Sequence, residues 1–160
     1  MRIAVIDGQG GGIGKLLVEK LRRALPEEVE IIALGSNAVA TAAMLKAGAN
    51  SGGSGENAIV QTAPAVDLIV GTIGVVVAHS MLGEITPRIA EAVARSPARK
   101  LLLHLNRAGI EIIGASKEPL PHLADMLVAE VRAHLHEQTA KGSRLLQTAA
   151  ATPVSKNFDA

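Results

Sequence analysis

The fold is decided by the stretch Arg2-Ile3-Ala4-Val5-Ile6-Asp7-Gly8-Gln9-Gly10-Gly11-Gly12-Ile13-Gly14-Lys15. Residues 2–7 form a short apolar run that stops at glycines, which is typical of a buried strand entering a turn. Apolar residues then recur at helical spacing, at Ile13, Leu16, Leu17, Leu21 and Ala24. Pro26 ends this helix. The chain is therefore predicted to begin with a strand, a glycine-rich turn and a helix.

Five further strands are predicted from short apolar runs, at Val29–Leu34, Ala58–Val60, Asp67–Gly71, Leu101–Leu105 and Ile110–Ile113. Helical patterns lie between them. The last one begins near Pro121 and carries apolar residues on one face, namely Ala124, Leu127, Val128, Val131 and Leu135. This alternation favours an α/β protein with a Rossmann-like, doubly wound, mostly parallel sheet of about six strands in three αβα layers. By analogy with that fold, the expected strand order is 3-2-1-4-5-6.

A chain of 160 residues is expected to form one domain. We place this domain at residues 1–139 and a C-terminal tail at residues 140–160, where the helical periodicity is lost. The glycine- and serine-rich stretch Asn50–Gly55 is expected to be a flexible loop.

Composition excludes several classes of function. Hydrophobic residues make up 48% of the chain, yet it has no Trp or Tyr and a single Phe, Phe158, so the stacking platforms of single-stranded nucleic-acid binders are missing. The net charge is only +1, and positive and negative residues are mixed along the chain, which argues against nucleic acid as a partner.

The absence of Cys excludes disulfides and thiolate chemistry, and no metal site is expected. The most apolar stretch, Leu68–Leu82, is too short to cross a membrane. With no signal peptide at the N-terminus, a cytoplasmic protein is expected.

The first glycine turn predicts a phosphate site. Glycines let a ligand approach the backbone, and free N–H groups at a helix start attract anions. A second glycine turn follows the strand at Asp67–Gly71, and in a doubly wound sheet both turns face the crevice where the strand order reverses. The expected ligand-binding residues are Gly8, Gln9, Gly10, Gly11, Gly12, Ile13, Gly14, Lys15, Ser36, Asn37, Gly71, Thr72, Ile73, Gly74 and Arg107. The partner is therefore expected to be a phosphate-bearing small molecule, with NAD or NADP as the candidate cofactors.

Several motifs compete for the first turn. Gly8, Gly12 and Gly14 fit the G-x-x-x-G-I-G cofactor turn of short-chain dehydrogenases, whereas a phosphate-binding P-loop fails at Gln9 and Leu16. The pattern also distantly resembles the D-x-H-x-x-G turn of cobalamin domains, with Gln9 in place of the imidazole. A glycine turn that only packs tightly is a further alternative. The acidic residue that NAD sites carry at the end of the second strand is missing; Ser36 and Asn37 stand there and could donate to a 2′-phosphate.

Candidate acid–base groups are Asp7, His79 and Glu84, although capping of the turn is the favoured role for Asp7. The Tyr-x-x-x-Lys pair of short-chain dehydrogenases is impossible without Tyr. If the protein is an enzyme, an NAD(P)-linked oxidoreductase is the nearest class. The alternative is a non-catalytic ligand-sensing or interaction subunit. A homodimer is compatible with a short apolar chain, but no stripe in the sequence identifies an interface.

Four segments, Ile6–Lys15, Ala43–Asn50, Ser80–Pro87 and Pro119–Leu123, resemble a small bacterial family known as domain of unknown function 3842. The resemblance covers the chain from Met1 to about Leu135. It implies a Rossmann-like fold and no established activity, so it transfers no catalytic residue.

Overall fold

The computed structural model describes the backbone of residues 1–105 and 109–150, and the side chains of these residues as far as Lys141. Its centre is a five-stranded parallel sheet in the order β3-β2-β1-β4-β5. The strands are β1 (Arg2–Asp7), β2 (Glu30–Gly35), β3 (Ser51–Ser54), β4 (Leu68–Thr72) and β5 (Arg99–Leu103). The order reverses between β1 and β4, so the crevice predicted there lies at the carboxyl ends of these two strands.

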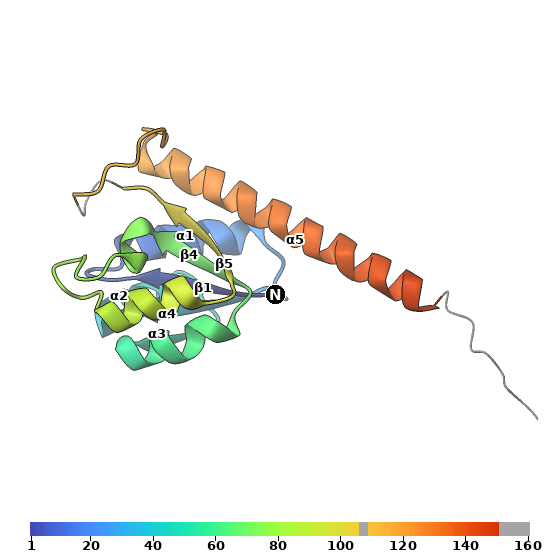
Figure 1. Ribbon diagram of the computed structural model, residues 1–160, viewed down its shortest axis with the longest axis horizontal. Helices are drawn as coiled ribbons and strands as arrows, with labels where there is room; N and C mark the ends of the chain where they lie inside the picture. Colours follow the sequence, from blue (N-terminus) through green and yellow to red (C-terminus); the bar gives the residue numbers. More distant parts are fainter. Residues whose placement is uncertain (106–108, 151–160) are drawn as a thin grey trace, which may run out of the picture.

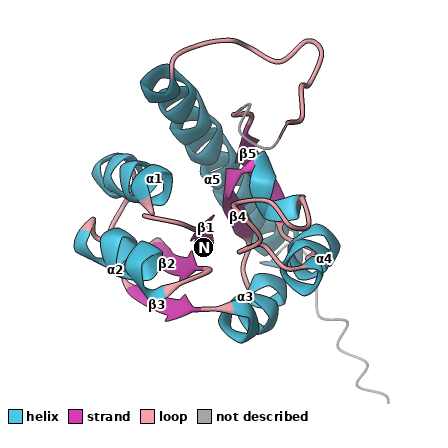
Figure 2. Cartoon of the chain, turned by 90° about the vertical axis from the view of Figure 1, so that its left-hand side faces the viewer, coloured by secondary structure: helices cyan, strands magenta, loops and turns pink. Residues whose placement is uncertain are grey.

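Helices cover both faces of the sheet (Figures 1 and 2). One face carries α1 (Gly12–Ala24), α2 (Ala38–Lys46) and α5 (Leu120–Ala150), and the other carries α3 (Glu56–Thr62) and α4 (Pro87–Arg95). Alternate residues of each strand point to opposite faces, so Val5 joins the core under α1 and α5, while Ile6 joins the core over α3 and α4. The prediction of a doubly wound α/β fold in three layers is confirmed, with five strands where about six were expected.

Two predicted strands were wrong. Ala58–Val60 lies in α3, because only Ile59 of this run is fully buried, as on one face of a helix. The third strand is instead Ser51–Ser54, inside the stretch expected to be a flexible loop. A Cβ atom on Gly52 would lie 2.9 Å from Thr41 Cγ2, so this edge strand needs glycine to pass beneath α2.

Ile110–Ile113 forms no strand. Gly109 and Gly114, on either side of it, have positive φ angles of 69° and 87° and turn the chain away from the sheet. Ile113 is 90% exposed, so the apolar run does not contribute to the core.

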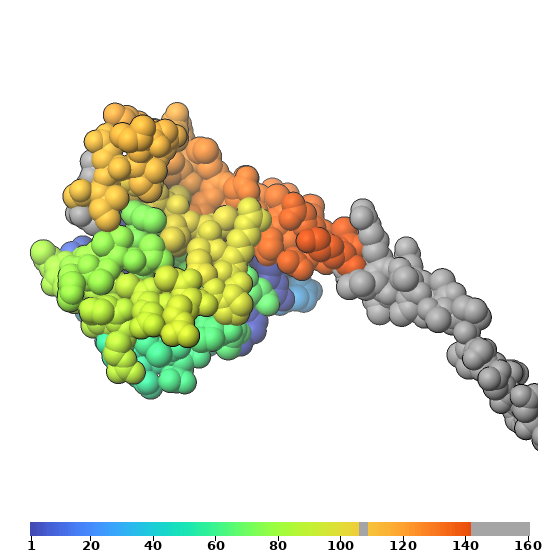
Figure 3. All heavy atoms as spheres, viewed as in Figure 1, coloured from blue at the N-terminus to red at the C-terminus, as the bar shows by residue number. Residues whose placement is uncertain are grey.

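The last helix confirms its predicted apolar face, since Ala124, Leu127, Val128 and Val131 are buried. It continues to Ala150, through the beginning of the stretch expected as a tail, and its last turns project beyond the sheet (Figure 1). In the space-filling view, the part of this helix before residue 142 already extends past the rest of the fold (Figure 3). Within the part of the chain that the structure describes, no helix combines the length and apolar character needed to cross a membrane.

Candidate functional site

The first glycine turn lies at the carboxyl edge of the sheet, the edge that faces the viewer in Figure 2. Asp7 ends β1 and is 5% exposed. Its Oδ1 accepts a hydrogen bond from the Gly8 amide at 2.8 Å, and its Oδ2 accepts one from the Gly14 amide at 2.6 Å. The carboxylate thus bridges the two ends of the turn, which agrees with the predicted capping role. A Cβ on Gly14 would come within 2.8 Å of Asp7 Cβ, so glycine is required for this approach.

The turn uses only part of its backbone amides internally. The Gly11 amide donates to the Gly8 carbonyl at 2.9 Å, and the Gln9 amide donates to Glu84 Oε2 at 2.8 Å. The amides of Gly10, Gly12 and Ile13 have no acceptor among the described residues. They stand at the N-terminus of α1, where the helix dipole adds attraction for negative charge.

Glu84 lies on the turn from a distant part of the chain. It belongs to the segment that joins β4 to α4, residues 73–86, which we call the strap. Its Oε2 accepts hydrogen bonds from the Gln9 amide at 2.8 Å, from Asn37 Nδ2 at 2.8 Å and from the Ser36 hydroxyl. The Ser36 hydroxyl and then the Gln9 amide lower the pKa of Glu84 below its ordinary value, because both stabilise the charged form. Glu84 is therefore an ionised group that holds the strap on the turn.

The strap occupies the place where a ligand was expected to approach Gly8. A Cβ on this glycine would lie 2.6 Å from Ser36 Oγ, 2.8 Å from Met81 Sδ and 2.9 Å from Glu84 Oε2. Gly8 is thus needed for close approach, but the atoms that approach it belong to the protein. Ser36 and Asn37, expected to donate to a 2′-phosphate, donate to Glu84 instead. Asn37 also caps α2 by accepting from the Ala40 amide at 2.9 Å.

A cavity of about 140 Å³ lies between the two turns. It is lined by Asp7, Gln9, Ile13, Thr72, Gly74, Ser80, Met81, Leu82 and Leu105. The structure therefore brings the first turn together with Thr72 and Gly74 of the second, as predicted from the topology. Gly71 and Ile73 do not line it. Gly71 packs within β4, where a Cβ would lie 2.7 Å from the Ile6 carbonyl oxygen.

The remaining predicted residues lie elsewhere. Lys15 is exposed and forms an ion pair with Glu19 at 3.8 Å, directed along the helix surface. His79 is exposed and does not line the cavity. Arg107 lies outside the described residues.

Three cavity-lining residues of the strap were not predicted, although Gly74, His79 and Glu84 of the same segment were candidates. Ser80, Met81 and Leu82 line the cavity, and the Ser80 hydroxyl donates to the Gly74 carbonyl at 2.6 Å. His79, Met81 and Leu82 all have positive φ angles, between 55° and 67°. No composition signal marks these residues for left-handed backbone, so only the neighbouring Gly83 could have indicated a turn.

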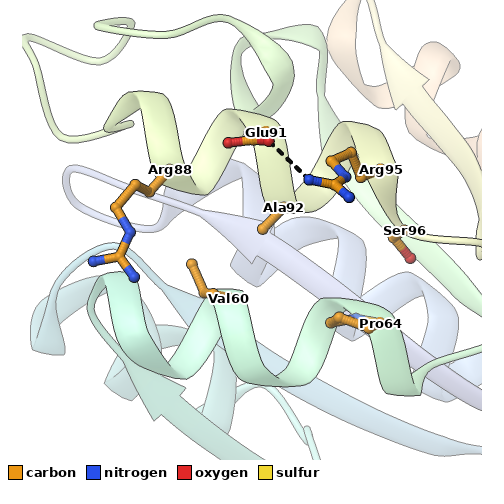
Figure 4. Close-up of a pocket in the computed structure, with 7 residues that line it drawn as sticks. All are labelled: Val60, Pro64, Arg88, Glu91, Ala92, Arg95 and Ser96. Carbon is orange, nitrogen blue, oxygen red and sulfur yellow. Dashed lines mark hydrogen bonds and ion pairs between the residues drawn. The ribbon is translucent and has the colours of Figure 1, made fainter.

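A larger cavity, of about 380 Å³, lies between α3 and α4 (Figure 4). It is lined by Val60, Pro64, Arg88, Glu91, Ala92, Arg95 and Ser96. Its two arginines are already paired, Arg88 with Glu56 at 3.0 Å and Arg95 with Glu91 at 3.1 Å. It is also remote from the carboxyl ends of the strands, so it is a weaker candidate than the smaller cavity between the turns.

Comparison with known proteins gives one family match. The model of a family described as "Domain of unknown function (DUF3842)" matches residues 2–136. No curated protein matches the chain significantly. Among solved structures, a universal stress protein in complex with cAMP is similar with a TM-score of 0.36 and 24% sequence identity, over 63% of this chain and 95% of that chain.

Proposed function

Because the chain belongs to the family described as domain of unknown function DUF3842, we propose its function from the contacts of the site itself. We propose that the protein binds a small phosphate-bearing molecule of the nucleotide class at the N-terminus of α1. The observation that carries this proposal is the group of three amides, those of Gly10, Gly12 and Ile13, that point to no acceptor among the described residues. Backbone amides at a helix start are suited to phosphate oxygens by both hydrogen bonding and dipole.

The surroundings of these amides support the proposal. Among the described residues, apart from chain neighbours and the backbone of α1 itself, no atom lies within 4 Å of a Cβ position on Gly10 or Gly12, so the backbone is open to a ligand there. Ile13 also lines the cavity between the turns, and Thr72 lines its opposite wall. A phosphate on the amides would therefore lie at the mouth of a cavity lined by both glycine turns.

The size of the cavity limits what enters it in this state. Sites for small molecules and cofactors usually measure about 300–1,000 Å³. The cavity between the turns measures about 140 Å³, so NAD or NADP requires the strap to move. A phosphate group with a small attachment does not.

The contacts of the three candidate acid–base residues support binding without catalysis. Both carboxylate oxygens of Asp7 already accept hydrogen bonds from backbone amides. Glu84 has a lowered pKa and so is a weaker base than an ordinary glutamate. His79 is exposed and outside the cavity lining. We therefore propose a ligand-sensing protein in preference to an NAD(P)-linked oxidoreductase; the cytoplasmic location and the homodimer stay predictions.

Calorimetric melting across phosphate, AMP, ADP, ATP, NAD and NADP tests the proposal and suits a chain without Trp or Tyr. A ligand at 100 times its dissociation constant adds about 2.7 kcal/mol to the free energy of unfolding. Sodium chloride at matched ionic strength is the control for general charge screening. If none of the six raises the melting temperature beyond that control, the proposal is wrong.

A further inference from the structure

Three donors converge on one oxygen of Glu84, and nothing in their arrangement is specific to a glutamate. They are the Gln9 amide, the Ser36 hydroxyl and Asn37 Nδ2, which we call the seat. The seat joins the first turn to the start of α2 and offers hydrogen atoms from three directions. Any oxyanion of similar size could accept them, because donors of this kind recognise charge and oxygen geometry.

The segment that delivers Glu84 is held in an unfavourable backbone conformation. His79, Met81 and Leu82 have φ angles of 67°, 55° and 58°, a region that costs energy for residues with a Cβ. Leu82 is 95% exposed, so its apolar side chain gains nothing from this conformation. Contacts such as those of Glu84 with the seat help to offset this cost. Val75 and Ile85 keep both ends of the strap in the core, at 0% exposed, so the part that can leave once Glu84 is displaced is the tip of the strap, residues 81–84.

The seat and the free amides are adjacent along the backbone. Gln9 supplies the amide of the seat, and Gly10 supplies the first free amide. A phosphate on the amides of Gly10, Gly12 and Ile13 would bind beside the residue whose amide holds the Glu84 carboxylate. Its negative charge would repel that carboxylate. Two phosphates joined by a single bridging oxygen could reach both places at once.

We propose, on the premise of the phosphate site above, that the seat receives a second phosphate and that the ligand is a diphosphate. Glu84 fills the seat in the free protein, the diphosphate displaces it, and the tip of the strap is released from the turn. The release opens the cavity to whatever group the diphosphate carries. Glu84 thus weakens the binding of a diphosphate more than that of a single phosphate, and it couples the binding of a diphosphate to release of the tip.

Titration calorimetry of inorganic phosphate and pyrophosphate into the wild type and Glu84→Gln tests this. Glutamine keeps the shape of the side chain but removes the charge, so its hold on the seat is weaker. The apparent affinity scales with the fraction of protein in the open state. We therefore expect pyrophosphate to bind Glu84→Gln at least about tenfold more tightly than the wild type, and the affinity for phosphate to change by less than about threefold.

Glu28→Gln, at an exposed glutamate remote from the turn, is the control with the same change in net charge and is expected to behave as the wild type. Calorimetric melting checks that each variant folds, and Glu84→Asp, which keeps the charge but shortens the reach, is the second variant, with an expected intermediate gain.

The outcomes separate this inference from the proposed function. Equal gains for phosphate and pyrophosphate would mean that Glu84 only repels anions in general, and the second seat would be refuted. Weaker pyrophosphate binding in Glu84→Gln would mean that the carboxylate helps to hold the ligand, which also refutes the inference. No binding of either anion to any variant would refute the phosphate site and this inference with it.

Discussion

Replacement of Gly12 by Asp should raise stability and lower ligand affinity at the same time. Gly12 is the first residue of α1, is exposed and does not have a positive φ. No atom of another described segment lies within 4 Å of its Cβ position, so a side chain fits there without strain. A carboxylate in the first turn of a helix gains about 0.3–1 kcal/mol from the dipole. The same carboxylate would stand where the phosphate is proposed to bind.

Asp and Asn side chains have nearly the same shape, so a comparison of Gly12→Asp with Gly12→Asn isolates the effect of the charge on the melting temperature and on the ligand affinity. In a protein of this size, 1 kcal/mol shifts the melting temperature by about 2–4 °C, so Gly12→Asp should melt about 1–4 °C above Gly12→Asn. Two unit charges about 4 Å apart repel by about 1–4 kcal/mol between the limits of bulk water and a protein surface. Pyrophosphate should therefore bind Gly12→Asp at least about fivefold more weakly than Gly12→Asn.

Differential scanning and titration calorimetry on the two variants measure both quantities. Equal pyrophosphate affinity in the two variants would show that the phosphate does not bind at the start of α1. A lower melting temperature in Gly12→Asp would mean that any loss of affinity reflects damage to the turn, and the dipole reasoning would be refuted as well.

Three further predictions concern the turn and the strap. Asp7→Asn leaves one of two buried amides without a good acceptor and should cost about 1.5–3 kcal/mol in urea unfolding followed by circular dichroism; an unchanged unfolding free energy would contradict the capping role. The pKa of Glu84 is lowered on folding, so its contribution to stability is complete at pH values above the ordinary glutamate pKa and is lost as the pH falls through the lowered pKa. The melting temperatures of wild type and Glu84→Gln, measured by calorimetry between pH 6 and about 3, should therefore converge as the pH falls. Melting temperatures that keep a constant difference would count against the hydrogen bonds to the carboxylate. Gly8→Ala places a Cβ within 3 Å of atoms of Ser36, Met81 and Glu84, so it should lift the strap and speed hydrogen exchange at the Gln9 amide; exchange as slow as in the wild type would show that the strap is not held over Gly8.

The parts of the fold that the sequence predicts well depend on contacts close along the chain. The order of β1, turn and α1 follows from an apolar run, glycines and a helical repeat that are contiguous. The capping role of Asp7 was also predictable, because its carboxylate needs to reach only Gly8 and Gly14. Analogy with doubly wound sheets predicted the order 3-2-1-4-5-6. The sheet has the first five places of this order, with Ser51–Ser54 as the third strand and no sixth strand among the described residues. Thr72 and Gly74 line the same cavity as residues of the first turn.

The edge strand β3 could not be predicted in the same way. Ser51–Ser54 has no residue with high strand propensity, and its conformation depends on space beneath neighbouring helices. A Cβ on Gly52 would approach Thr41, and one on Gly53 would lie 2.9 Å from Ala58 Cβ. Side chains far along the chain thus decide that two glycines form a strand, whereas the apolar run at Ala58–Val60 becomes a helix that buries only Ile59. Periodicity cannot separate these outcomes over three residues.

Glu84 was a candidate acid–base group in the sequence, but no local signal indicated that it would fill the seat, and this contact changes the ligand that the site favours. The carboxylate expected at the end of the second strand is missing from residues 34–37, but Glu84 brings one to that place from 75 positions beyond Gln9. Ser36 and Asn37 are therefore not free donors for a 2′-phosphate, and a ribose would separate such a phosphate from the pyrophosphate on the turn. Because Gln9 and Gly10 are neighbours, the spacing of the seat and the free amides fits two directly linked phosphates better. A nucleoside diphosphate should thus compete with pyrophosphate for the turn, whereas a 2′-phosphate alone would have to displace Glu84 without the help of a charge on the adjacent amides.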